Sequence, residues 1–175
     1  AGPVPGPDGV ERAGIPWGEA YTDPATGAVS RGSVSVVNIH TGHPTKEIEV
    51  GLHPNAILSS PDERFLYVAN GNSDFISVIR TSTQSVTDSI PVGLFGTEKG
   101  YIGSTPNALA VNQEGNRLYV SNGLDNAICI IDLEETPSGK NYRVLGYIPT
   151  EAYPSGIVLH GDQIIVTNLE STGAR

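Results

Sequence analysis

Sulfur is almost missing from this sequence, which contains one cysteine and no methionine among its 175 residues. Because Cys129 is the single cysteine, no disulfide can form within the chain. The thiol lies in the apolar run 127–131, which favours a buried and unreactive side chain. Since the sequence starts at Ala1 and has no Met, we expect a processed product or a piece of a longer protein.

Basic side chains are also scarce, because 10 Lys and Arg stand against 19 Asp and Glu, a formal net charge of -9. Nucleic-acid binding depends on basic side chains that contact phosphates, and anionic membranes recruit clusters of Lys and Arg, so both partners are disfavoured. No stretch approaches the roughly 20 apolar residues of a membrane-spanning helix, and no signal-peptide pattern is visible. The acidic balance itself is typical of an ordinary soluble surface.

What the sequence does contain is one pattern that occurs three times. A turn with proline at its second position recurs at intervals of 52 and 48 residues, as His53-Pro54-Asn55-Ala56, Thr105-Pro106-Asn107-Ala108 and Tyr153-Pro154-Ser155-Gly156. A short segment that ends in asparagine follows each turn, as Tyr67-Val68-Ala69-Asn70, Tyr119-Val120-Ser121-Asn122 and Ile165-Val166-Thr167-Asn168. A half copy precedes them, because 34–38 matches 76–80 and 128–132. A fixed period in this range predicts a solenoid or a propeller.

One copy of the pattern predicts four consecutive antiparallel strands, at 56–59, 65–70, 75–80 and 85–92. The turns between them are rich in turn-forming residues. Segment 65–70 is apolar almost throughout, which indicates burial on both faces, whereas 85–92 is more polar. Buried inner strands and a polar last strand are typical of the blade of a β-propeller. The predicted fold class is therefore all-β, a partial β-propeller with four-stranded antiparallel blades, of which about three are represented.

The repeats also suggest how the chain is divided. We expect an irregular lead-in at 1–14, a partial first blade at 15–50, a blade at 51–92, a rim insertion at 93–104, a blade at 105–150 and the start of a further blade at 151–175. The insertion accounts for a first interval that exceeds the roughly 40–45 residues of a typical blade. In the next copy the extra residues fall at 134–141, between the third and fourth strands.

The repeats resemble the YVTN family of β-propellers, whose second-strand motif corresponds to 67–70, 119–122 and 165–168. The Ser-Pro-Asp turn at 60–62 supports the resemblance, which covers about residues 32–170. The third copy departs from the motif at Ile165 and has no Pro-Asp turn at 160–162. The resemblance implies a disc of about seven blades, whose remaining blades would be partners of those present here.

A narrower resemblance, carried by 105–111, 122–127 and 144–154, is to bacterial propellers fused ahead of an alkaline-phosphatase-like phosphoesterase domain. In that group the catalytic metals belong to the downstream domain, so the resemblance implies no cofactor, metal or catalytic residue in this chain and a possible phosphoesterase partner domain. It also implies a periplasmic or extracellular location. Segment 60–70 is, in addition, similar to repeats of seven-bladed lactonases.

The turns that lead into each first strand are the candidate ligand-binding site, because such turns gather around the central channel of a propeller. Their polar members are His53, Asn55, Thr105, Asn107, Tyr153 and Ser155. A ring of polar groups at a channel mouth is able to hold a ligand or an ion. The alternative is that the Asn and Ser side chains only satisfy backbone groups of the turns.

Other polar residues have simpler interpretations. His40 and His43 lie in a Gly-containing turn without the three or four ligands of a zinc site. Asp74 and Asp125 occupy comparable loop positions, where they either bind calcium or form Asx turns. No serine-hydrolase elbow, phosphate-binding loop or zinc-protease motif occurs.

Three functions remain open at this point. The first is a non-catalytic propeller, part of a longer bacterial envelope or secreted protein, that binds a partner or ligand or positions an attached domain. The second is the propeller portion of a phosphoesterase whose active site lies outside this chain. The third is a lactonase-like hydrolase, against which the sparse acids and bases of the channel-side turns stand.

Overall fold

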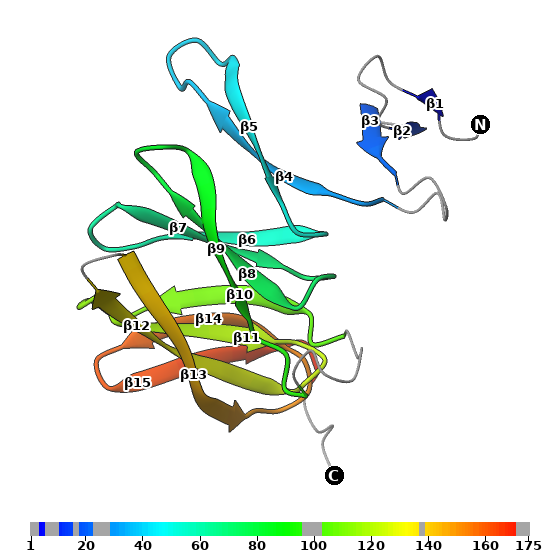
Figure 1. Ribbon diagram of the computed structural model, residues 1–175. Coiled ribbons are helices and arrows are strands. Elements are labelled where there is room, and N and C mark those ends of the chain that lie inside the picture. Colours follow the sequence, from blue (N-terminus) through cyan, green and yellow to red (C-terminus); the bar gives the residue numbers. More distant parts are fainter. Residues whose placement is uncertain are drawn as a thin grey trace.

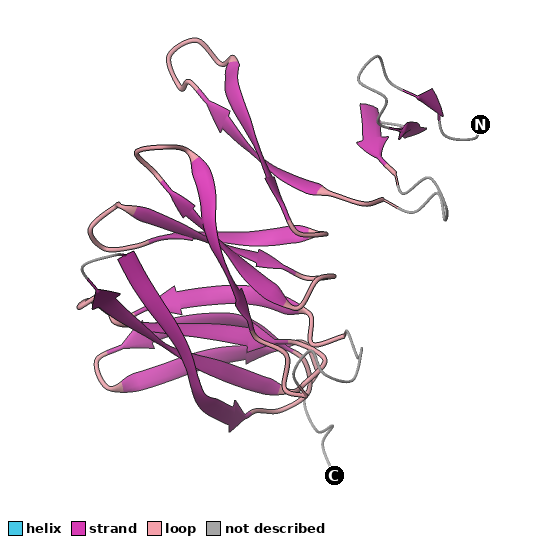
Figure 2. Cartoon of the chain, viewed as in Figure 1, coloured by secondary structure: helices cyan, strands magenta, loops and turns pink. Residues whose placement is uncertain are grey.

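The chain folds into strands and turns (Figure 2). The computed structural model describes residues 4–5, 11–15, 18–22, 29–95, 103–136 and 139–170. Within these ranges there is no helix, and so none that could cross a membrane. The strands are β1 (Val4–Pro5), β2 (Glu11–Ile15), β3 (Gly18–Tyr21), β4 (Gly32–Val37), β5 (Pro44–Val50), β6 (Pro54–Ser59), β7 (Phe65–Asn70), β8 (Phe75–Arg80), β9 (Ser85–Pro91), β10 (Pro106–Val111), β11 (Arg117–Asn122), β12 (Ala127–Thr136), β13 (Gly139–Pro149), β14 (Pro154–His160) and β15 (Gln163–Asn168). The predicted all-β fold class is confirmed.

Two complete four-stranded sheets form the centre of the described chain. One has the order β6-β7-β8-β9 and the other β10-β11-β12-β13, and every neighbouring pair is antiparallel. Consecutive strands therefore lie side by side, which is the arrangement of a propeller blade. The bounds of β7 and β8 agree with the predicted strands 65–70 and 75–80. Their apolar residues form the interior, where Tyr67 and Val78 are fully buried.

Half a blade flanks this pair on each side. β4 and β5 pair as a third and a fourth strand do, because their ladder has a one-residue bulge at Thr45 where the β8–β9 ladder has one at Thr87. At each bulge the threonine hydroxyl donates to a strand carbonyl, that of Val36 at 3.1 Å and that of Val78 at 3.4 Å. β14 and β15 pair as a first and a second strand do. A separate three-stranded sheet contains β1, β2 and β3.

The blades follow one another like the leaves of a fan (Figure 1). The first strand β10 contacts the first strands β6 and β14, one on each side. The main core lies between the two complete blades and combines Tyr67 of β7 with Leu118 of β11. A smaller cluster joins β5 to the first complete blade, with Ile48, Val68 and Ile79 buried together. The face of one sheet thus packs on the next, as stacked sheets in propellers do.

Two segments differ from what the sequence predicts. Residues 134–136 and 139–141, expected as part of the extra residues between the third and fourth strands, lengthen β12 and β13, whose pairing continues to Thr136 opposite Gly139. A longer hairpin satisfies these backbone groups with ladder hydrogen bonds, which a loop would have to leave to water. Segment 1–14, expected to be irregular, contains β1 and most of β2, and Pro5 lies in β1, an edge strand, where proline is tolerated. The division into blades otherwise stays a prediction, and the insertion at 93–104 is described only at 93–95 and 103–104.

Candidate functional site

The turns that precede the first strands repeat one uncommon backbone geometry. His53, Thr105 and Tyr153 have φ values of 55°, 53° and 56°, in the left-handed region that residues other than glycine seldom adopt. Their carbonyls accept hydrogen bonds of 2.9, 3.0 and 2.9 Å from the backbone N–H groups of Gly71, Gly123 and Leu169. These bonds tie the start of each first strand to the end of the second. We call this edge, with turns 52–56, 71–74, 104–108, 123–126 and 152–156, the channel-side rim.

Three of the predicted binding residues are bulged out of the strand ladder. Asn55, Asn107 and Ser155 have no opposite residue, because the pairing skips from Pro to the second residue after it in all three copies. A bulge re-aims a side chain away from the regular face of the sheet. Asn55 and Ser155 are exposed, and the Ser155 hydroxyl donates to the Thr167 carbonyl at 3.3 Å. The contact of Ser155 agrees with the alternative that these side chains satisfy backbone groups near the turns.

Asn107 differs from its two counterparts, because its side-chain amide is buried. Neither Nδ2 nor Oδ1 has a hydrogen-bond partner among the described residues. An unpaired amide inside a protein costs about 1–3 kcal/mol, so a buried orphan needs an explanation such as a water or a bound group. Asn107 is therefore the bulged residue whose amide groups form no hydrogen bond with the turn itself.

Two glycines on this rim make room for the bulged side chains. A Cβ added to Gly71 would lie 2.8 Å from Asn55 Nδ2 and 3.2 Å from His53 Nδ1. A Cβ added to Gly123 would lie 2.8 Å from Asn107 Nδ2 and 2.7 Å from Cζ of Tyr153. A side chain at either glycine would therefore force a neighbouring side chain to shift, since real Cβ contacts are essentially never shorter than 3.0 Å. Their separation of 52 residues, equal to the repeat, is the signal in the sequence that marks the two glycines as equivalent.

An acidic clamp fixes the end of the rim insertion. The Asp74 carboxylate accepts the backbone N–H groups of Gly103, Ser104 and Thr105, over 2.6, 3.0 and 3.2 Å. In the next blade Asn126 Oδ1 accepts the N–H of Tyr153 at 2.8 Å. Each clamp joins the turn before a third strand to the turn that opens the following blade.

The prediction that Asp74 and Asp125 are comparable is wrong. Asp74 corresponds to Asn126, because both directly precede a third strand and both have a φ of 52°. Asp125 lies one residue earlier, where its Oδ2 accepts Asn122 Nδ2 at 2.9 Å and the Leu94 N–H at 3.3 Å. Neither carboxylate forms a simple Asx turn, since both reach residues about 30 positions away. Matching the asparagines at 70 and 122 gives the correct alignment.

A pocket of about 830 Å³ opens on the channel-side rim between the first complete blade and its neighbours. Its apolar lining includes Val29, Leu52 and Leu124, and its polar lining includes Arg31 and Asn72. The Leu52 N–H donates to Ser73 Oγ at 2.9 Å, which holds this part of the wall in place. The wall of the pocket therefore combines apolar and polar side chains, and hydrogen bonds fix the turns that carry them.

The pocket brings together only part of the predicted binding residues. His53 and Thr105 line it, from consecutive blades. The other four, Asn55, Asn107, Tyr153 and Ser155, lie on the same rim without lining this pocket. Sequence reasoning missed its apolar wall, because Leu52 and Leu124 have no distinctive motif.

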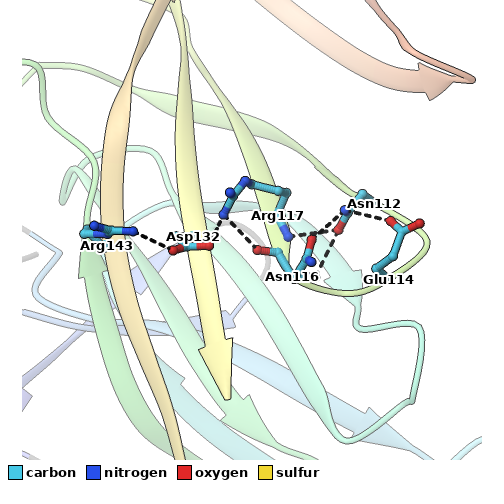
Figure 3. Close-up of polar contacts among 6 residues, drawn as sticks. All are labelled: Asn112, Glu114, Asn116, Arg117, Asp132 and Arg143. Atoms are coloured by element: carbon cyan, nitrogen blue, oxygen red, sulfur yellow. Dashed lines mark hydrogen bonds and ion pairs between the residues drawn. The ribbon is translucent and has the colours of Figure 1, made fainter. Parts of the chain in front are cut away.

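The opposite rim carries a second cleft, of about 890 Å³. Figure 3 shows its polar wall, in which Asp132 Oδ1 accepts Arg117 Nη1 and Asp132 Oδ2 accepts Arg143 Nη2 at 3.0 Å. The Asn112 amide organises the adjoining turn, because its Oδ1 accepts the N–H of Arg117 at 2.8 Å and its Nδ2 donates to Glu114 at 2.8 Å. The carboxylate of Asp132 is thus paired with the guanidinium groups of Arg117 and Arg143.

The equivalent turn of the preceding blade uses a serine and an aspartate. The Ser60 hydroxyl donates to Asp62 at 2.6 Å and accepts the Phe65 N–H at 3.0 Å. The hydrogen bond from Ser60 is the main reason that the pKa of the Asp62 carboxyl lies well below its ordinary value, and contacts with Arg64 add to it. The Ser-Pro-Asp turn is therefore a structural device of the blade.

Cys129 is buried, as predicted, and burial raises the pKa of its thiol to about 12. Its cross-strand neighbour Tyr147 lies at the blade edge, where the phenol donates to the Gly93 carbonyl at 3.0 Å. Burial also raises the pKa of this phenol. Both groups stay protonated at neutral pH, and the phenol of Tyr147 holds the beginning of the insertion in place.

No group of three or more His, Cys, Asp or Glu able to hold a metal ion occurs within the described ranges. His40 and His43 lie in the exposed turn between β4 and β5, where the Asn38 side chain accepts the His40 N–H at 2.9 Å. The interpretation of this segment as a plain turn agrees with that hydrogen bond.

Comparison with known proteins gives structural neighbours. No protein-family model matches the chain, and no curated protein matches it. The hydrazine synthase of Kuenenia stuttgartiensis has a TM-score of 0.63 and 27% identity, over 81% of this chain and 37% of that chain. A putative 6-phosphogluconolactonase from Bacteroides uniformis has a TM-score of 0.63 and 19% identity, over 95% of this chain and 46% of that chain.

The WD40 repeats of RRP9 are also similar, with a TM-score of 0.51 and 15% identity, over 67% of this chain and 34% of that chain. The chain thus spans less than half the length of each of these neighbours. WD40 repeats build propellers, so the comparisons and the stacked four-stranded sheets agree on a β-propeller fold.

Proposed function

We propose that this chain is a non-catalytic binding module, a part of a β-propeller whose channel-side rim holds a small ligand or a segment of a partner. The observation that carries the proposal is the rim pocket of about 830 Å³, where turns of successive blades converge. Ligand sites are commonly concave, with an apolar wall and a few placed polar groups. The rim pocket combines these features.

The shape of the rim supports binding by a site that is formed in advance. Asp74 holds three backbone N–H groups at one side of the pocket, and Ser73 holds Leu52 at the other. A wall fixed by such bonds loses little conformational freedom when a ligand arrives, which favours affinity. The polar groups of His53 and Thr105 supply hydrogen bonds within this frame. We expect a compact organic ligand with both an apolar and a polar part.

The wider context of the module comes from the resemblance to YVTN propellers. It supports a place in a longer bacterial protein of the envelope or the exterior, in which further blades complete the disc. The phosphoesterase alternative puts the active site of that protein outside this chain. Peptide sequencing and the intact mass of the native protein decide between them, because a metal-ligand cluster after further blades would identify the phosphoesterase.

A thermal-shift screen tests the binding proposal. The chain is heated with a panel of small carboxylic acids, phosphate esters and sugars, and any compound that raises the melting temperature is tested on Leu124→Glu. Leu124 is 60% exposed, so this change alters the pocket wall without loading the core. The matched control is Gln113→Glu, in the cleft of the opposite rim.

The proposal expects a shift that Leu124→Glu abolishes and Gln113→Glu retains. A panel without any shift, or a shift equal in both variants, contradicts it. The lactonase alternative has its own assay, in which the chain is incubated with a sugar lactone and ring opening is followed. Here the proposal expects no acceleration over buffer.

A further inference from the structure

We propose that the rim pocket binds an organic anion, a small molecule whose carboxylate or phosphate group faces Arg31 and His53. The inference rests on the proposed function, because it names the chemical class of the ligand for the same pocket. Arg31 and His53 are the ionisable side chains among the described residues that line it, and no carboxylate is among them. The guanidinium is always charged, and the imidazole keeps a ring N–H in either protonation state. The lining therefore offers an anion positive charge and N–H donors.

Two other clefts of the chain are acidic. Arg143 is the one cationic side chain among the described residues of the opposite-rim cleft, which is lined by four carboxylates: Asp62, Glu114, Asp132 and Glu134. A further cleft, of about 660 Å³, contains Glu114 and Asp162 and no Lys, Arg or His among its described lining residues. Because the chain has 19 Asp and Glu against 10 Lys and Arg, an acidic lining is the ordinary result. The rim pocket is thus the exception in the sign of its charge.

The carboxylates adjacent to the rim pocket are hydrogen-bonded within the fold. Asp74 accepts three backbone N–H groups, two of which belong to the lining residues Gly103 and Thr105. Asp125 accepts the side-chain amide of Asn122 and one backbone N–H group. Neither carboxylate lines the pocket. Since N–H donors partly balance their negative charge, the cationic side chains of the lining set the sign that a ligand meets.

A competing carboxylate contacts the Arg31 guanidinium. Arg31 Nη1 donates to Glu49 Oε2 at 2.9 Å, and the two side chains are 41% and 62% exposed. An ion pair at this exposure is worth little, because water solvates both charges. A guanidinium has five N–H donors in a planar fork, so it is able to contact two carboxylates at once. An anionic ligand therefore joins or displaces Glu49 at this group, and the charge of Glu49 lowers its affinity.

The rest of the lining defines what the anionic group is attached to. Val29, Leu52 and Leu124 are apolar, so the ligand needs an apolar body to cover them. Asn72 and Thr105 add hydrogen-bonding groups to the same lining. The net charge of -9 repels anions at long range, but exposed charges more than about 8 Å apart are largely screened at physiological ionic strength. The local charges therefore decide, and an aromatic or short aliphatic acid fits this pocket.

The first experiment compares charged and neutral probes of similar size. Chemical-shift titrations of the isotope-labelled chain follow the backbone amides of Leu52 and Thr105 while benzoate, phenyl phosphate or benzamide is added. The inference expects benzoate or phenyl phosphate to bind about tenfold more tightly than benzamide, since hydrogen bonds between charged groups are the stronger ones. A higher affinity of benzoate identifies the anion as a carboxylate, and a higher affinity of phenyl phosphate identifies it as a phosphate ester.

The second experiment changes the charges around the pocket. Arg31→Gln should weaken binding of the better acid about tenfold and leave that of benzamide unchanged. Glu49→Gln should strengthen binding of the same acid about two- to fivefold, because it removes the competing carboxylate. A gain of affinity is a result that damage to the fold would not produce. The matched control is Arg143→Gln on the opposite rim, whose guanidinium forms a similar ion pair with Asp132 at 3.0 Å (Figure 3).

Selective binding of an acid that Arg31→Gln weakens, Glu49→Gln strengthens and Arg143→Gln leaves unchanged supports the inference. Equal effects of Arg31→Gln and Arg143→Gln overturn it, because the charge would then act at a distance. Benzamide that binds as tightly as both acids, and that Leu124→Glu prevents from binding, overturns the anionic ligand while the binding rim stands. If none of the three probes shifts the two amides, the inference fails, and the proposed function fails with it only when the thermal-shift panel is also without effect.

Discussion

The two complete blades have the same strand order, but different side chains form the hydrogen bonds that fix their equivalent turns. Before the third strand, Asp74 binds three N–H groups in one blade and Asn126 binds one in the other. At the turn after the first strand, Ser60 stands where Asn112 stands 52 residues later. The repeat thus specifies the strands and the turn positions with left-handed backbone geometry. The side chain that fixes each connection to the next blade differs between the blades.

The largest expected effects come from the core, where the blades should behave alike. Ile79 and Ile131 hold the same repeat position and are both fully buried. Replacing either with Ala should lower the free energy of unfolding by about 2–5 kcal/mol, because lost burial and a cavity add up. Denaturant unfolding of both variants checks this. A difference of more than about 1.5 kcal/mol between them would contradict equal cores.

The glycines of the channel-side rim should distinguish the blades. Gly123→Ala places a Cβ against the Tyr153 ring and the buried Asn107 amide, and we expect a loss of about 1–3 kcal/mol from overpacking. Gly71→Ala meets the exposed side chains of Asn55 and His53, which can move, so its loss should be smaller. Equal melting temperatures of the two variants would show that exposure does not decide the cost.

The next largest losses of stability should come from the hydrogen bonds of Asp74 and Asn126, and the loss should be larger for Asp74. Asp74→Ala leaves three N–H groups without their acceptor, and we expect a loss of about 1–3 kcal/mol. Asn126→Ala removes one hydrogen bond, which is worth about 0.5–1.5 kcal/mol. Asp88→Ala, on the exposed strand β9, is the control. Unfolding free energies in the reverse order would break the comparison.

The smallest expected effect is a pH dependence of the stability, caused by Asp62 in the Ser-Pro-Asp turn. The pKa of Asp62 in the folded chain lies below its ordinary value of 3.8, so the ionised carboxyl stabilises the fold above that pH. As the pH falls below 3.8 toward the folded pKa, this contribution is lost. Melting curves of the protein and of Asp62→Asn should therefore converge in acid. A constant gap between pH 7 and pH 3 would show that the turn does not depend on the charge.

Much of one blade could be predicted from the sequence, because its strands are short apolar runs between strong turn signals. The segments 65–70 and 75–80 agree with β7 and β8 to the residue. The lengthened hairpin at 134–141 could not be predicted, because its polar residues show no alternation that separates a paired ribbon from a loop. Nor could the hydrogen bonds of Asp74, since the backbone N–H groups that donate to it lie some 30 residues away across an insertion.

Only part of the candidate site could be predicted from the sequence, for a similar reason. His53 and Thr105 follow from the repeat, and both line the rim pocket. Leu52 and Leu124 are ordinary leucines in sequence, and only the convergence of two blades makes them one wall. The assignment of the six rim residues to a ligand stays a prediction that the thermal-shift screen can decide.

The close approach of Gly71 to Asn55 and of Gly123 to Asn107 has a consequence for how the repeats can diverge. In the third copy a serine, Ser155, takes the asparagine position and Leu169 takes the glycine position. A smaller residue at the asparagine position removes one of the close contacts that a side chain at the glycine position would make. The cost of a side chain at the glycine position therefore depends on the residue at the asparagine position, so the effects of mutations at the two positions should not be additive.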